Sequence, residues 1–328
     1  MVISRTPLRV SFVGGGTDLP SYANQHGGAV LSTTIDQYIY VVVSERFEDS
    51  LRVSYSKTEI VDRVDDLEHE LVREALKLAG LRRKIEIVTI ADVPTQGTGL
   101  GSSSAVTVGV LNALFAFQGV LKSGVELARA ASHIEIEVLG KAIGRQDQYA
   151  TALGGLRLLR FDPEDVVQAQ LLPLKREMAA TLERNLLMFY TGRQRAATTI
   201  LSGLSAQIGK VETATKSLTR MRDIALELFQ SLSAGTSPEI LGDALHENWE
   251  LKRGLHASVS DGELDKLYER ARAHGAMGGK ILGAGGGGFL LLYVEDEHQP
   301  AVRRALSDLR EMPFRFEPTG STIIHIGR

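Results

Sequence analysis

Apolar residues along the first half of the chain recur with two periodicities, one typical of strands and one typical of helices. Short runs rich in β-branched residues predict strands at residues 8–12, 38–44, 51–55, 84–90 and 156–161. Apolar residues three and four positions apart predict helices at residues 66–79, 103–118 and 124–140. The short loops between these elements indicate one α/β or α+β unit.

The second half follows a stretch, residues 161–177, in which two prolines and several charges interrupt the periodic pattern. A new strand is then predicted at 185–192. The remaining pattern predicts helices at 194–232, 237–256, 261–274 and 298–310, and strands at 288–294, 313–317 and 321–326. Helices covering one face of a small sheet fit this order. We place a boundary between about 170 and 185, which divides the chain into domains 1–180 and 181–328.

Composition narrows the class of partner. The chain of 328 residues has 37 Lys and Arg against 40 Asp and Glu, so its charge favours neither nucleic acid nor an anionic membrane as a partner. It has no cysteine, which excludes disulfides and thiolate chemistry, and its eight histidines show no convincing metal-ligand spacing. The N-terminus is too polar for a signal peptide and no apolar run approaches a membrane span, so we expect a cytoplasmic location and a small-molecule ligand.

A glycine- and serine-rich loop, "PTQGTGLGSSSA" (94–105), joins the predicted strand 84–90 to the predicted helix 103–118. Glycines let the backbone approach a ligand closely, and the start of a helix offers free N–H groups. This combination favours phosphate binding. One serine would suffice as an ordinary helix cap, but three in a row exceed that need.

A second glycine-rich piece, "GAGGGG" (283–288), formally matches the dinucleotide-binding spacing at Gly283, Gly285 and Gly288. That fingerprint must open a helix, whereas these glycines lead into the apolar run "FLLLYV", which predicts a strand. A Walker loop is also absent from the sequence. If the chain binds ATP, it does so through another fold.

Three motifs in order, "TPLRVSFVGGGTD" (6–18), the loop 94–105 and "KILGAGGGGFLLL" (280–292), resemble those of the galactokinase, homoserine kinase, mevalonate kinase and phosphomevalonate kinase (GHMP kinase) superfamily. The resemblance spans nearly the full chain. It implies an α+β fold of two domains, an N-terminal domain like ribosomal protein S5 and a ferredoxin-like C-terminal domain. It also implies an enzyme that uses ATP and Mg²⁺.

Within the superfamily, "GGGTDLP" (14–20), "GRQDQYATALGG" (144–155) and "LLMFYTGRQRAA" (186–197) are similar to the branch of sugar-1-kinases that act on D-glycero-D-manno-heptose 7-phosphate. That branch phosphorylates the anomeric hydroxyl and leads to nucleotide-activated heptose for surface polysaccharide. Fucokinase domains share much of the pattern. The alternatives are therefore a kinase for an unphosphorylated sugar of the fucose or galactose type, or a non-catalytic sugar- or nucleotide-binding relative.

The resemblance implies roles for residues of the second motif. The expected ATP-binding residues all lie in the loop and the first turn after it: Pro94, Gly97, Gly99, Leu100, Gly101, Ser102, Ser103 and Ser104. Ser103 and Glu135 match the positions that hold Mg²⁺ through hard oxygen ligands. Glu137 is a second candidate nearby, and Glu135 could instead be a solvated helix residue.

The resemblance also implies the catalytic pair. Asp147, in "GRQDQYA", matches the aspartate that accepts or orients the proton of the acceptor hydroxyl. Arg9 lies within a predicted strand, where an unpaired guanidinium is costly, so it needs a partner or a function. It matches the basic residue that stabilises the aspartate or the charge on the transferred phosphate. The sequence leaves open whether Asp147 is a true base or only positions the hydroxyl.

Substrate-binding residues are expected in the first and third motifs and at the start of the second half: Gly16, Thr17, Asp18, Arg193, Gly285, Gly286 and Gly287. Asp18 could instead cap a turn. Arg193 and Arg195 suit a phosphate because of their planar forks, or they are solvated charges. Residues 35–41 line either the adenine or the sugar. The sequence does not indicate an oligomeric state.

Overall fold

The computed structural model contains two β-sheets, in which most neighbouring strands are antiparallel. It describes residues 1–94, 97–164, 166–194, 200–201, 203–205, 208 and 212–327. The larger sheet has the order β12-β1-β2-β5-β3-β4, with β6 on β2 and β7 on β6. Its strands are β1 (Val2–Val13), β2 (Gly28–Glu45), β3 (Leu51–Ser54), β4 (Thr58–Val61), β5 (Ile85–Ala91), β6 (Arg157–Phe161), β7 (Val167–Leu171) and β12 (Thr322–Ile326).

The smaller sheet has the order β11-β8-β10-β9. Its strands are β8 (Leu186–Tyr190), β9 (Gly278–Ile281), β10 (Phe289–Tyr293) and β11 (Arg310–Glu311). The helices are α1 (Pro20–His26), α2 (Glu70–Ala79), α3 (Ser102–Phe117), α4 (Gly124–Ser132), α5 (Gln146–Leu153), α6 (Arg176–Arg184), α8 (Glu212–Ser233), α9 (Ile240–Arg253), α10 (Gly262–Ala273) and α11 (Gln299–Ala305). This is the α+β architecture that the sequence predicts.

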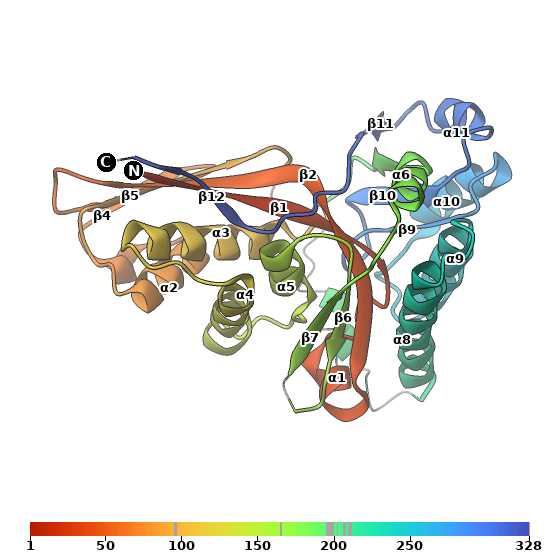
Figure 1. Ribbon diagram of the computed structural model, residues 1–328, viewed down its shortest axis with the longest axis horizontal. Coiled ribbons are helices and arrows are strands. Elements are labelled where there is room, and N and C mark those ends of the chain that lie inside the picture. The colour runs from red at the N-terminus through yellow and green to blue at the C-terminus, as the bar shows by residue number, and fades with distance from the viewer. Residues whose placement is uncertain are drawn as a thin grey trace.

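The long ribbon of β1 and β2 connects the two halves of the molecule. Figure 1 shows α2 to α5 on one side of the larger sheet. The start of β2, next to α1, runs beside α8. Residues 6–13 of β1 are all buried, because helices cover both faces of the ribbon there. Residues 28–35 of β2 are likewise all buried, so they carry no polar–apolar alternation, and the sequence predicts this strand only from residue 38.

The two ends of the chain lie side by side at the outer edge of the larger sheet (Figure 1). β12 pairs with β1 in antiparallel fashion, so the last strand belongs to the sheet that the first strand begins. The division at residue 180 stays a prediction, but the chain returns from the second half to the first after β11.

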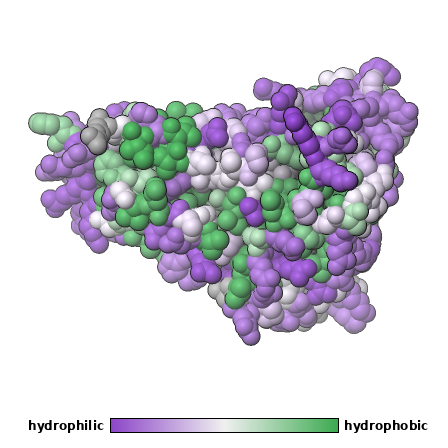
Figure 2. All heavy atoms as spheres, viewed as in Figure 1, coloured by the Kyte–Doolittle hydropathy of each residue, from purple (hydrophilic) through white to green (hydrophobic). Residues whose placement is uncertain are grey.

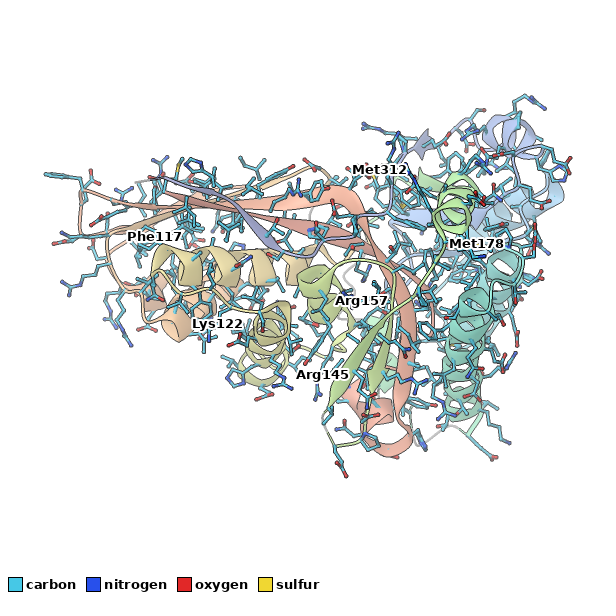
Figure 3. All side chains as sticks on the ribbon, viewed as in Figure 1. Phe117, Lys122, Arg145, Arg157, Met178 and Met312 are labelled. Atoms are coloured by element: carbon cyan, nitrogen blue, oxygen red, sulfur yellow. The ribbon has the colours of Figure 1, made fainter. Side chains whose placement is uncertain are left out.

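The two halves of the molecule differ in the hydropathy of the surface that they expose on this face. Figure 2 shows hydrophobic residues gathered mainly over the half with the larger sheet, whereas the half with α8 to α11 is mostly hydrophilic on this face. Figure 3 places Phe117, at the end of α3, near the outer end of the larger sheet, and Met178 and Met312 beside the smaller sheet. Both methionines pack against the main core. Within the described residues, no helix is long and apolar enough to cross a membrane.

Several predicted elements differ from the structure. The expected helix 124–140 is α-helical only to Ser132 and continues as a π-helical segment, His133–Val138. The expected strand 313–317 is reduced to a single bridge, Phe316 to Ile35. α1, β4, α5, β7, α6, β9 and β11 were not predicted, because each has at most nine residues and is too short to show a clear periodic pattern. Part of the expected helix 194–232 lies outside the described residues.

Helix α9 crosses β9 at very short range through two glycines. A Cβ atom at Gly278 would lie 1.9 Å from the carbonyl oxygen of Gly242. Both positions therefore require glycine for a steric reason, independent of backbone dihedrals. The crossing holds α9 against the sheet that carries the third glycine-rich motif.

We expect Gly278→Ala to lower the free energy of unfolding by about 1–3 kcal/mol or more, because the backbone of α9 must move away from β9. The matched control is Gly262→Ala at the start of α10, where an added Cβ meets nothing within 4 Å. Denaturant unfolding of both variants measures the difference. Equal stability of the two variants would contradict the close crossing.

Candidate active site

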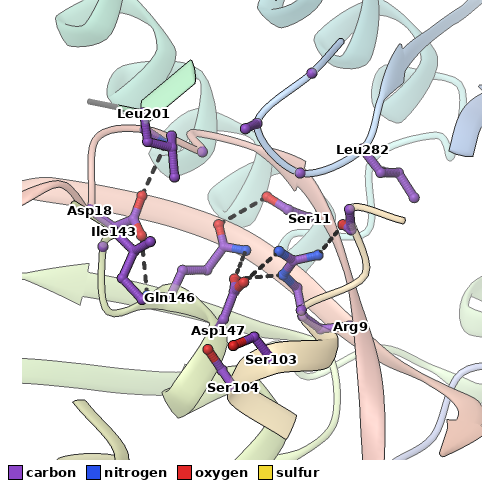
Figure 4. Close-up of a pocket in the computed structure, with 18 of the residues that line it drawn as sticks. Arg9, Ser11, Asp18, Ser103, Ser104, Ile143, Gln146, Asp147, Leu201 and Leu282 are labelled. Carbon is purple, nitrogen blue, oxygen red and sulfur yellow. Dashed lines mark hydrogen bonds and ion pairs between the residues drawn. The ribbon is translucent and has the colours of Figure 1, made fainter. Parts of the chain in front are cut away.

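Arg9 and Asp147 form the central ion pair of the molecule. Arg9 is 4% exposed, and its Nε and Nη2 donate to Oδ1 and Oδ2 of Asp147, both at 2.7 Å. Its Nη1 donates to the carbonyl oxygen of Gly99 in the glycine- and serine-rich loop. Figure 4 shows this network at the floor of a cavity. The expectation that the buried guanidinium has a partner is confirmed.

A register shift in β1 precedes Arg9. The pairing of β1 with β2 shifts between Pro7 and Leu8, and proline cannot donate to the ladder. Such bulges commonly redirect the side chains that follow. The backbone N–H of Arg9 donates to the carbonyl of Leu100 at 3.0 Å, so β1 also holds the loop directly.

Asp147 is the second residue of α5, and neighbouring amides hold its carboxylate. Nε2 of Gln146 donates to Asp147 Oδ1 at 3.1 Å, and Ser11 donates to Gln146 Oε1 at 3.1 Å. With 29% of its side chain exposed, Asp147 remains accessible from the cavity. One face of this carboxylate is therefore fixed and the other can meet a ligand.

The glycine- and serine-rich loop ends at Gly101, which has a φ of 75° and caps α3. No side chain in the described part of the chain caps this helix, so its first-turn N–H groups stay available to a ligand. The alternative of serines acting as ordinary caps therefore has no support in the geometry. The loop also packs backbone to backbone on the third motif, where a Cβ at Gly283 would lie 2.5 Å from Cα of Gly99.

The cavity above the ion pair has a volume of about 640 Å³. Residues of all three motifs line it, together with the end of α9 and the segment that follows α9. The predicted site residues that line the cavity are Arg9, Gly16, Asp18, Gly97, Gly99, Gly101, Ser102, Ser103, Ser104, Glu135, Asp147, Gly285 and Gly287. The structure thus brings most predicted site residues together.

Five predicted residues do not line this cavity: Thr17, Leu100, Gly286, Pro94 and Arg193. Thr17 is fully buried, with its hydroxyl 2.8 Å from the carbonyl of Gly14, and so supports the first-motif turn. Leu100 is also buried, and Gly286 donates its N–H to the carbonyl of Val259. Pro94 lines a neighbouring cavity instead.

Arg193 also lies away from the cavity wall. Its guanidinium makes two hydrogen bonds to Asp261, at 3.0 and 2.7 Å, and one to Glu263 at 3.1 Å. Asp261 caps α10 as well. A phosphate at Arg193 would have to compete with these carboxylates. Arg195 lies outside the described residues.

Glu135 lies in the π-helical segment, and such segments are frequent at functional sites. Its side chain is fully buried, and Ser104 donates to its Oε2 at 3.1 Å. In the described part of the chain, Oε1 is buried with no hydrogen-bond partner. Burial raises the pKa of Glu135 to about 7. Glu137, the other candidate, is exposed and pairs with His133.

Asp18 contacts both the first motif and α5. Its Oδ1 accepts from the N–H of Gly16 at 3.0 Å, and its Oδ2 accepts from the N–H of Gln146 at 3.2 Å. Burial, followed by the charge of Asp147, raises the pKa of Asp18. Gly144 permits this approach, because a Cβ there would lie 1.9 Å from Oδ2. Asp18 therefore positions α5 while it lines the cavity.

Lys252 is a cavity residue that the sequence analysis missed. It lies in α9 at 5% exposure, and its ammonium donates to the carbonyl of Gly283. Burial, followed by the charge of Arg9, lowers its pKa to about 8. The spacing of the buried residues Leu241, Leu245 and Asn248 places position 252 on the buried face of α9, and that periodicity was the available signal.

A second cavity, of about 550 Å³, adjoins the first. The two share Ser102, Ser103 and Lys141. Its other walls include apolar and aromatic side chains, among them Ile39, Tyr55, Leu71, Ile90 and Val93. Of the segment 35–41, Ile39 lines this second cavity and none of it lines the first.

A helix start that offers free amides beside a buried Arg–Asp pair is an arrangement that suits the transfer of a phosphoryl group. The sequence models "GHMP kinases N terminal domain" and "GHMP kinases C terminal" match residues 56–155 and 225–310. The chain is 30% identical to the D-glycero-alpha-D-manno-heptose 7-phosphate kinase of Campylobacter jejuni, with 92% of each chain covered. The chain belongs to the GHMP kinases, and it is a phosphotransferase with an alcohol group as acceptor.

Further relatives share the fold. The crystal structure of a D-glycero-D-manno-heptose 1-phosphate kinase from Bacteroides thetaiotaomicron matches all of both chains at 27% identity, with a TM-score of 0.82. The L-fucokinase/L-fucose-1-P guanylyltransferase of Bacteroides fragilis is 27% identical to this chain. The match covers 92% of this chain and 35% of that longer protein. The predicted family and its two-domain α+β fold are confirmed.

The raised pKa of Glu135 predicts a pH dependence of stability in metal-free buffer. The folded state keeps a proton on Glu135 up to about pH 7, whereas the unfolded chain loses it near 4.5, so the contribution to stability is fully present below 4.5 and is lost progressively as the pH rises from there through 7. The full change is about 3 kcal/mol. Glu135→Gln should remove it.

Denaturant unfolding of both proteins between pH 5 and pH 8 measures this effect as the difference between wild type and Glu135→Gln. Glu137→Gln is the matched control, because Glu137 is exposed. A difference between wild type and Glu135→Gln that stays constant with pH would show that Glu135 is ionised throughout.

Proposed function

We propose that this chain is an ATP-dependent sugar kinase that phosphorylates the anomeric hydroxyl of D-glycero-D-manno-heptose 7-phosphate to give the 1,7-bisphosphate. The observation that carries the proposal is the Arg9–Asp147 pair, which faces the same cavity as the open amides of α3. The heptose 7-phosphate kinase of Campylobacter jejuni supports the choice of substrate. The product would then serve the formation of nucleotide-activated heptose for surface polysaccharide.

ATP would extend across both cavities. Its phosphates would accept from the first-turn N–H groups of α3, beside Ser102 and Ser103, which line both spaces. The apolar and aromatic part of the wall of the second cavity suits the faces of a purine base, and polar side chains that also line it, among them His69 and Thr89, suit the polar edge of the base. Ile39 would then contact the nucleotide rather than the sugar.

Mg²⁺ fits the residues around Glu135. The unpartnered Oε1 of Glu135 and the hydroxyl of Ser103 are hard oxygen donors in the wall of the first cavity, and Mg²⁺ usually takes only one or two protein ligands. When bound, the ion would spread the negative charge of the ATP phosphates. The hydrogen bond from Ser104 holds the other oxygen of Glu135 in place.

The chain's own residues suit an in-line phosphoryl transfer. As the acceptor oxygen forms a bond to the γ-phosphorus, the bond from that phosphorus to the bridging oxygen breaks and ADP leaves. The acceptor's proton would pass to Asp147, whose carboxylate Arg9 orients through two hydrogen bonds. Asp18 would bind sugar hydroxyls through the face of its carboxylate that lines the cavity.

A kinase for an unphosphorylated sugar of the fucose type is the alternative, and the Bacteroides fragilis relative supports it. The two alternatives differ in how a distal phosphate is held. Arg193 stays a candidate for that role, although its present bonds to Asp261 would have to open.

The direct test is a screen of sugars and sugar phosphates for ATP consumption, with the position of phosphorylation read by phosphorus NMR. We expect the heptose 7-phosphate to be consumed fastest and the new phosphate to lie on the anomeric carbon. Faster turnover of fucose or galactose would move the assignment to the alternative. Consumption of none of the sugars would reject a sugar kinase.

Asp147→Asn should abolish turnover and leave the affinity for ATP nearly unchanged, because the carboxylate faces the acceptor side of the cavity and is held by Arg9. Steady-state rates and a nucleotide titration measure the two quantities. Asp162→Asn, beyond the end of β6, is a control that we expect to behave as wild type. A near-wild-type rate for Asp147→Asn would remove Asp147 from the chemical step.

A further inference from the structure

Lys252 is an unusual cation because its side chain is buried in the second half of the chain and yet lines the first cavity. A lone buried ammonium is costly unless a partner or a ligand compensates for lost hydration. Lys252 is 5% exposed and lines the first cavity. Its burial thus calls for a specific compensating group.

The protein supplies only part of that compensation. An ammonium carries three N–H donors, and within the described part of the chain the carbonyl of Gly283 is the one acceptor bonded to Lys252. The other cations on the cavity wall are ion-paired, since Arg9 binds Asp147 and Lys141 binds Glu70 at 2.8 Å. Two donors of Lys252 therefore remain for a ligand in the cavity.

Its position is set from two sides. Asn248, one turn earlier in α9, accepts from the N–H of Gly14 in the first motif at 2.9 Å. Lys252 itself contacts Gly283 of the third motif. These two bonds fix α9 against both motifs, so the ammonium is held where the first and third motifs meet.

The charges that surround Lys252 are those of the reaction centre. Arg9 of β1, Asp18 in the turn after β1 and Asp147 of α5 all act on its titration. Lys280 of β9 also lies within range, but its ammonium donates to the carbonyls of Ser11 and Phe12 and is fully buried. Lys252 is the cation of this group with donors open toward the cavity.

We propose that Lys252 binds the acceptor at its reacting end: its two open N–H donors bind acceptor oxygens beside the attacking hydroxyl, and its charge stabilises the negative charge that develops there. The inference rests on the proposed kinase function and adds an acceptor-binding residue to it. A carboxylate pair, Asp18 and Asp147, would otherwise face a developing oxyanion in the cavity without an adjacent open cation.

The test compares Lys252→Met and Lys252→Arg with Lys266→Met, an exposed lysine of α10. With the acceptor that the wild type uses best, Lys252→Met should lose roughly 10²–10³-fold in kcat/KM, the loss typical for removal of one preorganised hydrogen-bond donor. Lys252→Arg should retain part of the rate, and Lys266→Met should match wild type. The affinity for ATP, measured by titration, should change less than about threefold in all variants.

A purely structural role for Lys252 predicts different results. It would lower Tm and weaken ATP binding together with the rate, because the loop at Gly283 packs on the phosphate-binding loop. Unchanged kcat/KM in Lys252→Met, or parallel losses of ATP affinity and rate, would overturn the proposal. A loss confined to a phosphorylated acceptor, with its unphosphorylated form unaffected, would instead place Lys252 at the distal phosphate and also overturn it.

The pH profile supplies a second readout. Since burial lowers the pKa of Lys252 to about 8, the wild-type kcat/KM should fall as the pH rises through that value and the cation is lost. In Lys252→Arg the fall should move to higher pH, because guanidinium stays protonated. An identical alkaline limb in both proteins would contradict the role of the charge. Failure of the wild type to consume any sugar would reject the kinase assignment instead, so the two failures are distinguishable.

Discussion

The buried guanidinium of Arg9 is the interaction on which the arrangement of the site depends. A charge at 4% exposure requires full compensation, and Asp147 and the carbonyl of Gly99 supply it from α5 and from the glycine- and serine-rich loop. Three segments that are far apart in the sequence must therefore meet at one point. The same bonds leave one side of Asp147 facing the cavity, so the compensation that permits burial also orients the carboxylate toward the cavity.

Close backbone contacts that only glycine permits connect the two halves of the molecule near Arg9. Gly99 and Gly283 pack with their backbones in direct contact, and Gly288 packs on Thr98 in the same way. A side chain at any of these positions would separate the glycine- and serine-rich loop from the third motif. The glycines thus hold together two loops that both line the first cavity.

Two residues that line the first cavity, Glu135 and Lys252, have pKa values that burial shifts. The pKa of Glu135 is raised to about 7 and that of Lys252 is lowered to about 8, both chiefly because burial disfavours the charged form. The proposed metal ion at Glu135 and the proposed acceptor at Lys252 would each favour the charged form of the residue that binds it.

The sequence by itself determined the local chemistry: the loop 94–105 before a helix, the glycines that lead into a strand, and the need of Arg9 for a partner. These features depend on neighbouring residues and on the cost of burying a charge, so they can be read without the fold. The tertiary structure alone decided which side chains meet. It bound Arg193 to Asp261, buried Glu135 rather than Glu137, and aimed Lys252 into the cavity, because each outcome depends on contacts between segments distant in the chain.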